Sequence, residues 1–142
     1  MKEMPTMLKL RIVKNKDYLD ILKHMLHDNN IIVYKDSNGK PFIKNSNYYF
    51  SVSHSANKMA LIISNHPVGI DMEIIRKYDS KLLKYLNIKS NLSNKDFFKE
   101  WTKREAYIKK NNLKLSNISI LDYSDSKFIT FKLFKRIISI CY

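Results

Sequence analysis

Apolar positions recur every three or four residues in two segments of the chain, and this period predicts helices. Between residues 17 and 27 the apolar side chains fall on one broad helical face, and Asn29-Asn30 is expected to end that helix. Between residues 93 and 110 the same spacing recurs. Ser93 is a candidate N-cap with Asp96 three residues later, and Asn111-Asn112 can supply a left-handed C-cap. Residues 80–86 predict a short third helix.

Shorter apolar or alternating runs, bounded by turn residues, predict strands. The run at 59–64 is apolar almost throughout, so this strand is expected at the centre of a sheet. Turns are expected at 36–39, 56–58 and 65–67. The pattern predicts an α+β fold, with helices packed on mostly antiparallel sheet. The predicted strands are 8–13, 31–34, 48–53, 59–64, 68–74, 118–123, 128–134 and 137–141.

Length and composition narrow the class of protein. The 142 residues suit one compact domain, and a hydrophobic content of 44% is enough to form a core. No apolar run approaches the roughly 18 residues of a membrane span, and the N-terminal residues do not resemble a secretory signal. One cysteine, Cys141, excludes an intramolecular disulfide framework and a cysteine-rich zinc site. These features favour a soluble cytoplasmic protein without a membrane partner.

The formal net charge of +13 adds a second constraint, because a positive field attracts anions such as nucleic acid, phosphorylated cofactors or an acidic protein. Lysine is normally exposed, so much of this charge also fits an ordinary solvated surface. Charge alone therefore does not choose among these partners.

Candidate chemistry begins with Asp71 and Glu73, which lie two residues apart in the predicted strand and so point to one side of it. Glu105 and Lys109 lie one helical turn apart in the predicted helix. Carboxylates from two elements suit Mg²⁺, which prefers oxygen ligands together with substrate phosphate. Glu105 could also accept a proton from a hydroxyl. Taken separately, the strand pair also fits two solvent-facing acids, and Glu105 with Lys109 fits a surface ion pair.

Two further segments carry polar groups at turns or strand ends. His54 lies in Ser51-Val52-Ser53-His54-Ser55, where hydroxyls and an imidazole could hold phosphate oxygens, although a lone histidine near a turn is usually structural. Gly39-Lys40-Pro41 is locally only a turn with an exposed lysine. The sequence contains no nucleophile elbow, no Walker A loop and no dinucleotide fingerprint.

In their order along the chain, four segments resemble the motifs of the Sfp-type 4′-phosphopantetheinyl transferases. The resemblance extends roughly from residue 17 to the C-terminus. Compared with the family, Ser51 replaces a usual Asn and Arg104 replaces the usual Lys before the glutamate. The four segments are Gly39-Lys40-Pro41, Phe50-Ser51-Val52-Ser53-His54-Ser55, Gly69-Ile70-Asp71-Met72-Glu73 and residues 101–109 from Trp101 to Lys109.

This resemblance implies an activity: transfer of 4′-phosphopantetheine from coenzyme A to a serine of an acyl or peptidyl carrier protein, with Mg²⁺. It also implies a fold of two similar α/β halves, here roughly 1–66 and 67–142 of a single domain, in a monomer. An acidic carrier protein would be the partner.

The resemblance also implies a role for each matching residue. Asp71, Glu73 and Glu105 would bind the metal, and Glu105 would also be the base for the carrier serine. Lys109 would contact the phosphates. The remaining matches would bind coenzyme A: Ser53 and His54 near its 3′-phosphate and pyrophosphate, and Lys40 and Pro41 at its nucleotide end.

Three alternatives remain open from the residues. A Mg²⁺-dependent nuclease would also combine carboxylates with a basic surface, but Ile75 stands where a common nuclease motif has a lysine. A non-enzymatic nucleic-acid-binding module would use lysines and tyrosines, but would not explain the carboxylates. A transferase-like protein that no longer turns over is the third.

Overall fold

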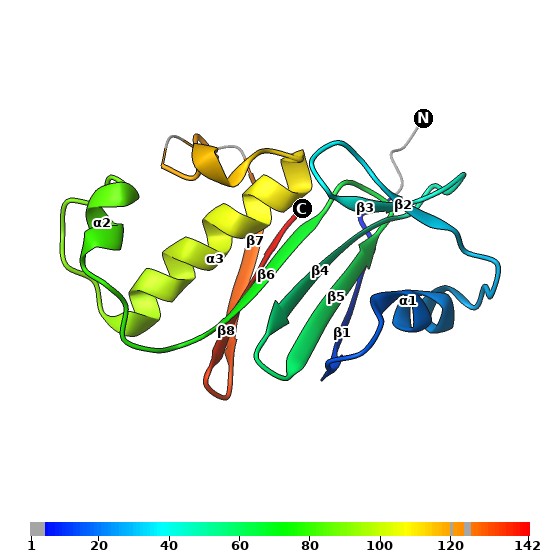
Figure 1. Cartoon of the computed structure of the whole chain (residues 1–142), viewed down its shortest axis with the longest axis horizontal. Coiled ribbons are helices and arrows are strands. Elements are labelled where there is room, and N and C mark those ends of the chain that lie inside the picture. The colour runs from blue at the N-terminus through cyan, green and yellow to red at the C-terminus, as the bar shows by residue number, and fades with distance from the viewer. Residues whose placement is uncertain (1–4, 120, 124–125) are drawn as a thin grey trace.

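The computed structural model describes residues 5–119, 121–123 and 126–142, and Figure 1 labels its elements. In the first part of the chain these are β1 (Leu8–Lys14), α1 (Tyr18–Leu26), β2 (Val33–Lys35), β3 (Pro41–Ile43), β4 (Tyr49–Ser55) and β5 (Lys58–Ser64). In the second part they are β6 (Gly69–Ile74), α2 (Lys81–Tyr85), α3 (Asn94–Asn111), a 3₁₀ turn (Leu115–Asn117), β7 (Phe128–Leu133) and β8 (Arg136–Cys141).

Two three-stranded antiparallel sheets form the frame of the molecule. The first has the order β1-β5-β4 and the second β6-β8-β7, while β2 and β3 form a separate hairpin. The predicted α+β class with mostly antiparallel sheet is confirmed. β5 is the central strand of its sheet and is buried along nearly its whole length, as its apolar sequence predicts. Among the described helices, none is both long and apolar enough to cross a membrane.

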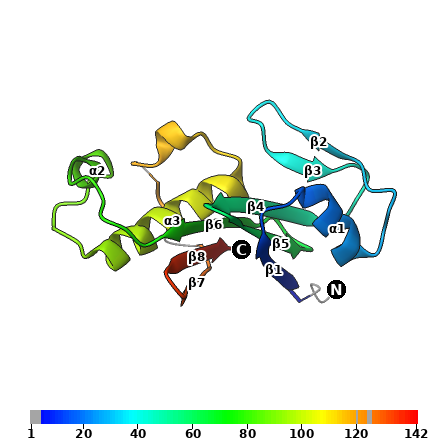
Figure 2. The ribbon, with the colours of Figure 1, turned by 60° about the horizontal axis from the view of Figure 1, so that its bottom comes forward.

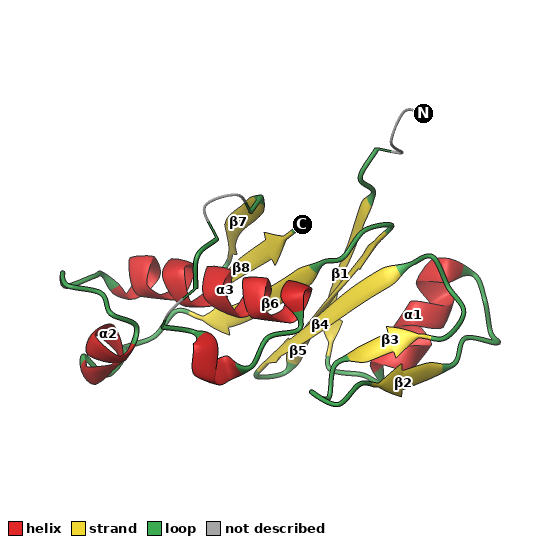
Figure 3. Cartoon of the chain, turned by 90° about the horizontal axis from the view of Figure 1, so that it is seen from above, coloured by secondary structure: helices red, strands yellow, loops and turns green. Residues whose placement is uncertain are grey.

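Each sheet has one helix on its outer face, and the inner faces of the two sheets pack together. Leu22 and Met25 of α1 pack on Phe50 and Leu61 of the first sheet. α3 covers β6 and β8, and Figures 2 and 3 show the two helices toward opposite ends of the molecule. A shared apolar cluster joins the two sheets. Its buried members are Ala60, Ile62, Val68, Ile70, Met72, Ile138 and Ile140.

The helix ends follow from local chemistry. The Ser93 hydroxyl accepts a hydrogen bond from the Asp96 N–H at 3.1 Å, and Asn112 adopts the left-handed C-cap conformation, so both predicted caps of α3 are confirmed. The predicted helix at 17–27 is confirmed, but His27 rather than Asn29-Asn30 ends it. The helix stops at Leu26, because His27 takes the left-handed conformation two residues before Asn29.

One strand prediction is wrong, and one strand was not predicted. Among the described residues of 118–123 there is no strand; the segment follows a 3₁₀ turn. The carbonyls of Ile118 and Asp122 accept hydrogen bonds from the side chains of Arg104 and Tyr107, so contacts with α3 replace a strand ladder. The strand that was not predicted is β3, which begins at Pro41, a residue expected only in a turn. The predicted strand at 31–34 lies slightly later, at Val33–Lys35.

Candidate active site at the junction of β4, β6 and α3

β6 directs alternate residues toward α3. Gly69, Asp71 and Glu73 lie on the face under the helix, while Ile70 and Met72 enter the cluster between the sheets. The helix lies so close that a Cβ on Gly69 would be 1.9 Å from the Ala106 carbonyl oxygen. Any other residue at this position would push α3 away from the carboxylates. The close approach of α3 to Asp71 and Glu73 thus requires a glycine at position 69. The sequence analysis did not identify this requirement.

Asp71 is a buried acid with an incomplete set of partners. Its Oδ1 accepts a hydrogen bond from the Ser53 hydroxyl at 3.1 Å and lies 3.5 Å from the Lys109 ammonium. Its Oδ2 is buried and has no hydrogen-bond partner among the described residues. Burial, followed by the charges of Glu105 and Glu73, raises the pKa of Asp71 to about 7, although Lys109 and Ser53 act in the opposite direction.

Glu105 and Glu73 complete the acidic surroundings. Burial raises the pKa of Glu105, and the charge of Glu73 raises it further, while Lys109 lowers it. Glu73 forms an ion pair with Arg76 at 3.0 Å, and the Arg76 guanidinium lies 4.6 Å from the centre of the Phe98 ring. The three carboxylates influence one another, yet in the part of the chain that the structure describes no three acidic, His or Cys side chains are gathered closely enough to bind a metal ion.

Lys109 joins three elements. From α3 its ammonium donates hydrogen bonds to the Val52 carbonyl of β4 at 3.2 Å and to the Ile70 carbonyl of β6 at 3.0 Å, and it faces Asp71. Two of the three N–H donors of this lysine thus bind backbone carbonyls, and the ammonium stays partly exposed beside Asp71. The side chain therefore fixes the relative positions of β4, β6 and α3 in this arrangement.

Two serines bridge the edges of the two sheets. The Ser51 hydroxyl accepts a hydrogen bond from the Ile70 N–H, and the Ser53 hydroxyl accepts one from the Met72 N–H, each at 3.1 Å. Both serines are buried on the side of β4 that faces β6. His54 is exposed on the opposite side of the strand. Ser53 and His54 therefore do not lie side by side, because neighbours on a strand point to opposite faces.

Lys40 lies at the other end of this junction. It contributes, with Gly39, Pro41, Val52 and Lys109, to the lining of a cavity of about 220 Å³ beside the last turn of α3. Its ammonium donates to the carbonyls of Lys109 and Lys110. Burial and the Lys109 charge lower the pKa of Lys40, while Asp36 raises it.

The loop carrying Lys40 is held against the end of α3. The side-chain amide of Asn38 donates a hydrogen bond to the backbone carbonyl of Asn112. The side-chain amide of Asn112 donates one to the Asp36 carboxylate. The Asp36 side chain also accepts from two N–H groups of its own loop. Sequence reasoning placed Gly39-Lys40-Pro41 in a turn but could not place that turn beside Lys109, because no local pattern links residues more than 60 apart.

Comparison with known proteins gives a consistent relationship. No family model matches the chain. It is 39% identical over 90 residues to the 4′-phosphopantetheinyl transferase gsp of Aneurinibacillus migulanus, covering 56% of this chain and 38% of that protein. It is 27% identical over 106 residues to the 4′-phosphopantetheinyl transferase psf-1 of Bacillus pumilus, covering 63% of this chain and 46% of that protein.

The aligned part therefore spans less than half the length of each of these relatives. Within that span the similarity is well above what four short motifs provide alone. The resemblance to the Sfp-type enzymes is thereby confirmed, and the aligned part of the chain is similar to two 4′-phosphopantetheinyl transferases.

Proposed function

We propose that this protein transfers the 4′-phosphopantetheine group of coenzyme A to a serine hydroxyl of an acyl or peptidyl carrier protein, with Mg²⁺. The observation that carries the proposal is the buried Asp71 carboxylate, with one oxygen lacking a described partner, beside Glu105 and Lys109. Two relatives are named for this transfer. The proposal includes a cytoplasmic monomer of one domain, with halves of roughly 1–66 and 67–142.

The Asp71 carboxylate suits a divalent cation, although the three carboxylates would have to move closer together to share one. A buried carboxylate with a raised pKa and an unbonded oxygen is stabilised by a positive charge, and Mg²⁺ prefers carboxylate oxygen together with phosphate oxygen. Asp71, Glu73 and Glu105 would hold the ion, with Glu73 leaving Arg76. When bound, the ion would neutralise charge on the pyrophosphate of coenzyme A.

The reaction exchanges one P–O bond for another. The serine oxygen of the carrier attacks the phosphorus that bears pantetheine, the bond to the bridging oxygen breaks, and 3′,5′-ADP leaves with the electron pair. In this proposal Glu105 accepts the serine proton, and its raised pKa makes it a stronger base than an exposed glutamate. Phosphoryl transfer depends mainly on alignment and charge neutralisation, which suits a site built from fixed charges.

Coenzyme A would lie along the junction. Lys40 and Pro41 line the cavity beside Lys109, so the nucleotide end is assigned there, with Lys109 near the phosphates. For Ser53 the proposed role is indirect: its hydroxyl already bonds to Asp71 and Met72 and would orient Asp71. His54 would bind the 3′-phosphate from the exposed side of β4, which separates its proposed contact from that of Ser53.

The test is incubation of the protein with coenzyme A, Mg²⁺ and a panel of apo carrier proteins, read by intact mass. A carrier gaining the mass of one phosphopantetheine group is the expected result, and Glu105→Gln should lower the rate roughly 10²–10⁴-fold. Asp96→Asn, on an exposed position of the same helix, is the control and should retain the wild-type rate. No mass gain on any carrier would reject the transferase proposal.

The same preparation separates the alternatives. A nuclease would degrade added DNA or RNA in a Mg²⁺-dependent manner, and a nucleic-acid-binding module would bind without degrading. The two acids near Lys109, Asp71 and Glu105, favour the transferase over the binding module, since such a module needs no buried carboxylate. An inactive transferase-like protein would bind coenzyme A without modifying any carrier.

A further inference from the structure

The turn between β7 and β8 carries an aromatic side chain in an unfavourable setting. Leu133 pairs with Arg136, so Phe134 and Lys135 form a two-residue turn. Phe134 has a φ of 54° and is 86% exposed, the largest exposure among the large apolar residues that the structure describes. A bulky residue is a true outlier in the left-handed region, which such turns normally fill with Gly, Asn or Asp. Both the backbone and the exposed ring oppose stability in the isolated molecule.

The exposed ring continues into an apolar edge. Ile129 and Leu133, each 39% exposed, share the inner face of β7 with the half-buried Phe131, which packs against the cluster between the sheets. β7 is the outer strand of its sheet. The tip and this edge together form a surface that we call the hairpin surface, made of Ile129, Phe131, Leu133 and Phe134.

Cations surround the hairpin surface. Lys135 is exposed in the turn, and Lys132 is exposed on the opposite face of β7 from Phe131 and Leu133. Arg136 donates from the base of the turn to the Ser55 carbonyl and the Asn57 side chain. These contacts hold the β7–β8 turn next to the β4–β5 turn, as Figure 1 shows at the lower edge of the molecule. The second turn adds Lys58, which pairs with Lys14 of β1.

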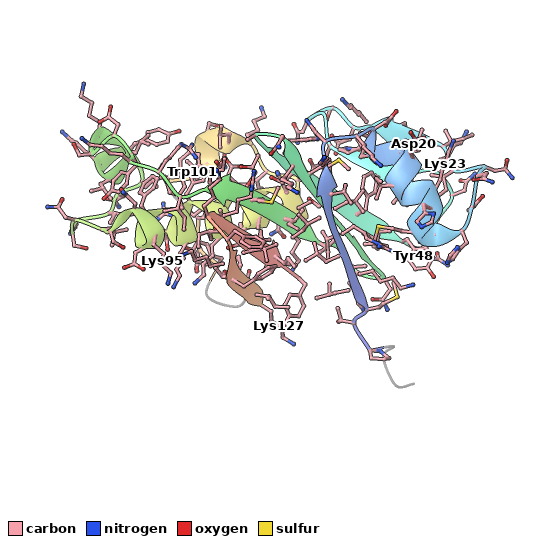
Figure 4. The ribbon with its side chains drawn as sticks, turned by 90° about the horizontal axis from the view of Figure 1, so that it is seen from below. Asp20, Lys23, Tyr48, Lys95, Trp101 and Lys127 are labelled. Carbon is pink, nitrogen blue, oxygen red and sulfur yellow. The ribbon has the colours of Figure 1, made fainter. Side chains whose placement is uncertain are left out.

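No acidic residue balances this charge within the strands that carry it. Residues 8–14, 49–64 and 126–142 contain no Asp or Glu. Other lysines lie farther from the turn. Lys95 on α3 and Lys127 before β7 extend outward in Figure 4. On α1, Lys23 lies together with the acidic Asp20. The combination of an apolar edge with an uncompensated basic rim fits an acidic protein surface that has an apolar contact at its centre.

The β7–β8 turn lies beside the end of β6, whereas Ile129, Phe131 and Leu133 lie on the face of the sheet opposite to Asp71 and Glu73. The Ile75 N–H donates to the Lys135 carbonyl at 2.8 Å, directly after the strand that carries Asp71 and Glu73. We infer that the hairpin surface docks the acidic carrier protein, with Phe134 as the apolar anchor and Lys132 and Lys135 as the charged rim. This inference rests on the proposed function for the identity of its partner.

The test uses two substitutions of one residue, of which only one is expected to raise the stability of the protein. Phe134→Asn favours the left-handed conformation, so it should raise the melting temperature by roughly 2–5 °C. Phe134→Ala removes the ring without that gain. Both should raise the KM for the carrier about tenfold, the usual effect of removing an aromatic anchor, and leave the KM for coenzyme A unchanged. Because Phe134→Asn is expected to be more stable than the wild type, a weaker interaction cannot be attributed to unfolding.

Lys132→Glu with Lys135→Glu should slow association with the carrier and reduce its dependence on salt. Tyr85→Ala, at a half-exposed aromatic of α2, and Lys95→Glu are the matched controls and should leave the carrier KM unchanged. An unchanged carrier KM in both Phe134 variants would overturn the inference while leaving the transferase proposal intact.

If the wild type modifies no carrier, calorimetry of its binding to acidic apo carriers tests the docking surface without relying on activity. Binding that Phe134→Asn weakens would support the docking surface although the transferase proposal had failed, and no binding would overturn it. Two other outcomes would also overturn it. One is Phe134-dependent sedimentation with phosphatidylglycerol vesicles and no carrier effect; the other is Phe134-dependent self-association in light scattering.

Discussion

At the scale of single residues, Asp71 connects stability to pH. In the folded protein burial and the nearby acids raise its pKa to about 7, whereas an aspartate in an unfolded chain has a pKa of about 3.9. Between these values the folded state binds more protons than the unfolded state. The contribution of Asp71 to the free energy of unfolding is therefore complete below pH 4, falls as the pH rises to about 7, and is constant above that.

Asp71→Asn should remove this dependence, because an amide resembles the protonated acid. We expect the free energy of unfolding of the variant, minus that of the wild type, to rise between pH 4 and 7 by on the order of 4 kcal/mol and then to level off. Urea unfolding at a series of pH values measures this difference. A difference that is flat across the range would show that Asp71 titrates normally.

The residue scale also shows where sequence reasoning about the site reached its limit. Strand alternation was enough to place Asp71 and Glu73 on one face, and the structure has them under α3. Alternation also implies that Ser53 and His54 point to opposite sides, whereas the resemblance assigns both residues to neighbouring parts of coenzyme A. The contacts of Lys109 with Val52 and Ile70 could not be predicted, because they depend on how three elements meet.

At the scale of elements, the contact between β6 and α3 depends on the missing side chain of Gly69. A methyl group there would overlap the Ala106 carbonyl at 1.9 Å and the Lys110 nitrogen at 2.6 Å, both backbone atoms that cannot move alone. Gly69→Ala should therefore lower the free energy of unfolding by at least about 3 kcal/mol, the upper end of ordinary overpacking. Thermal unfolding followed by circular dichroism measures it.

Gly39→Ala is the matched control for that experiment. A Cβ at Gly39 meets no atom within 4 Å, but the φ of 79° disfavours any side chain. The expected loss is only about 1–2 kcal/mol. Equal losses at the two glycines would contradict a role for close helix–strand contact.

Elements whose signals are local were predicted well, and those that depend on distant partners were not. α3 carries its own caps in Ser93 and Asn112, so its ends could be located from sequence. The segment at 118–123 has a strand-like sequence, but Arg104 and Tyr107 of α3 bind its carbonyls. β3 was missed because Pro41 reads as a turn residue, although the first position of a short strand also tolerates proline.

At the scale of the whole molecule, the two sheets are joined by side chains at the edge where β4 meets β6. Ser51 and Ser53 accept the hydrogen bonds of the Ile70 and Met72 N–H groups there. Replacing both serines with alanine should leave these amides without partners, which costs about 1–3 kcal/mol for each buried group. Hydrogen exchange at residues 70 and 72 should accelerate accordingly.

Ser64→Ala is the control for the joined edge. Ser64 is also fully buried, but its hydroxyl accepts from the His66 N–H in the following turn. Exchange at residues 70 and 72 should stay slow in this variant. Acceleration in the control equal to that in the double variant would indicate general loosening rather than loss of the two bridges.

Cys141, the only cysteine in the chain, lies buried at the end of β8, the central strand of the second sheet. Burial raises the pKa of this thiol, so both low access and a low thiolate fraction protect it from alkylation. Its rate of modification therefore measures how often β8 separates from its neighbours. The alkylation rate of Cys141 in the unmodified protein therefore reports the opening of the sheet that carries Asp71. It can be measured with and without coenzyme A, Mg²⁺ or a carrier.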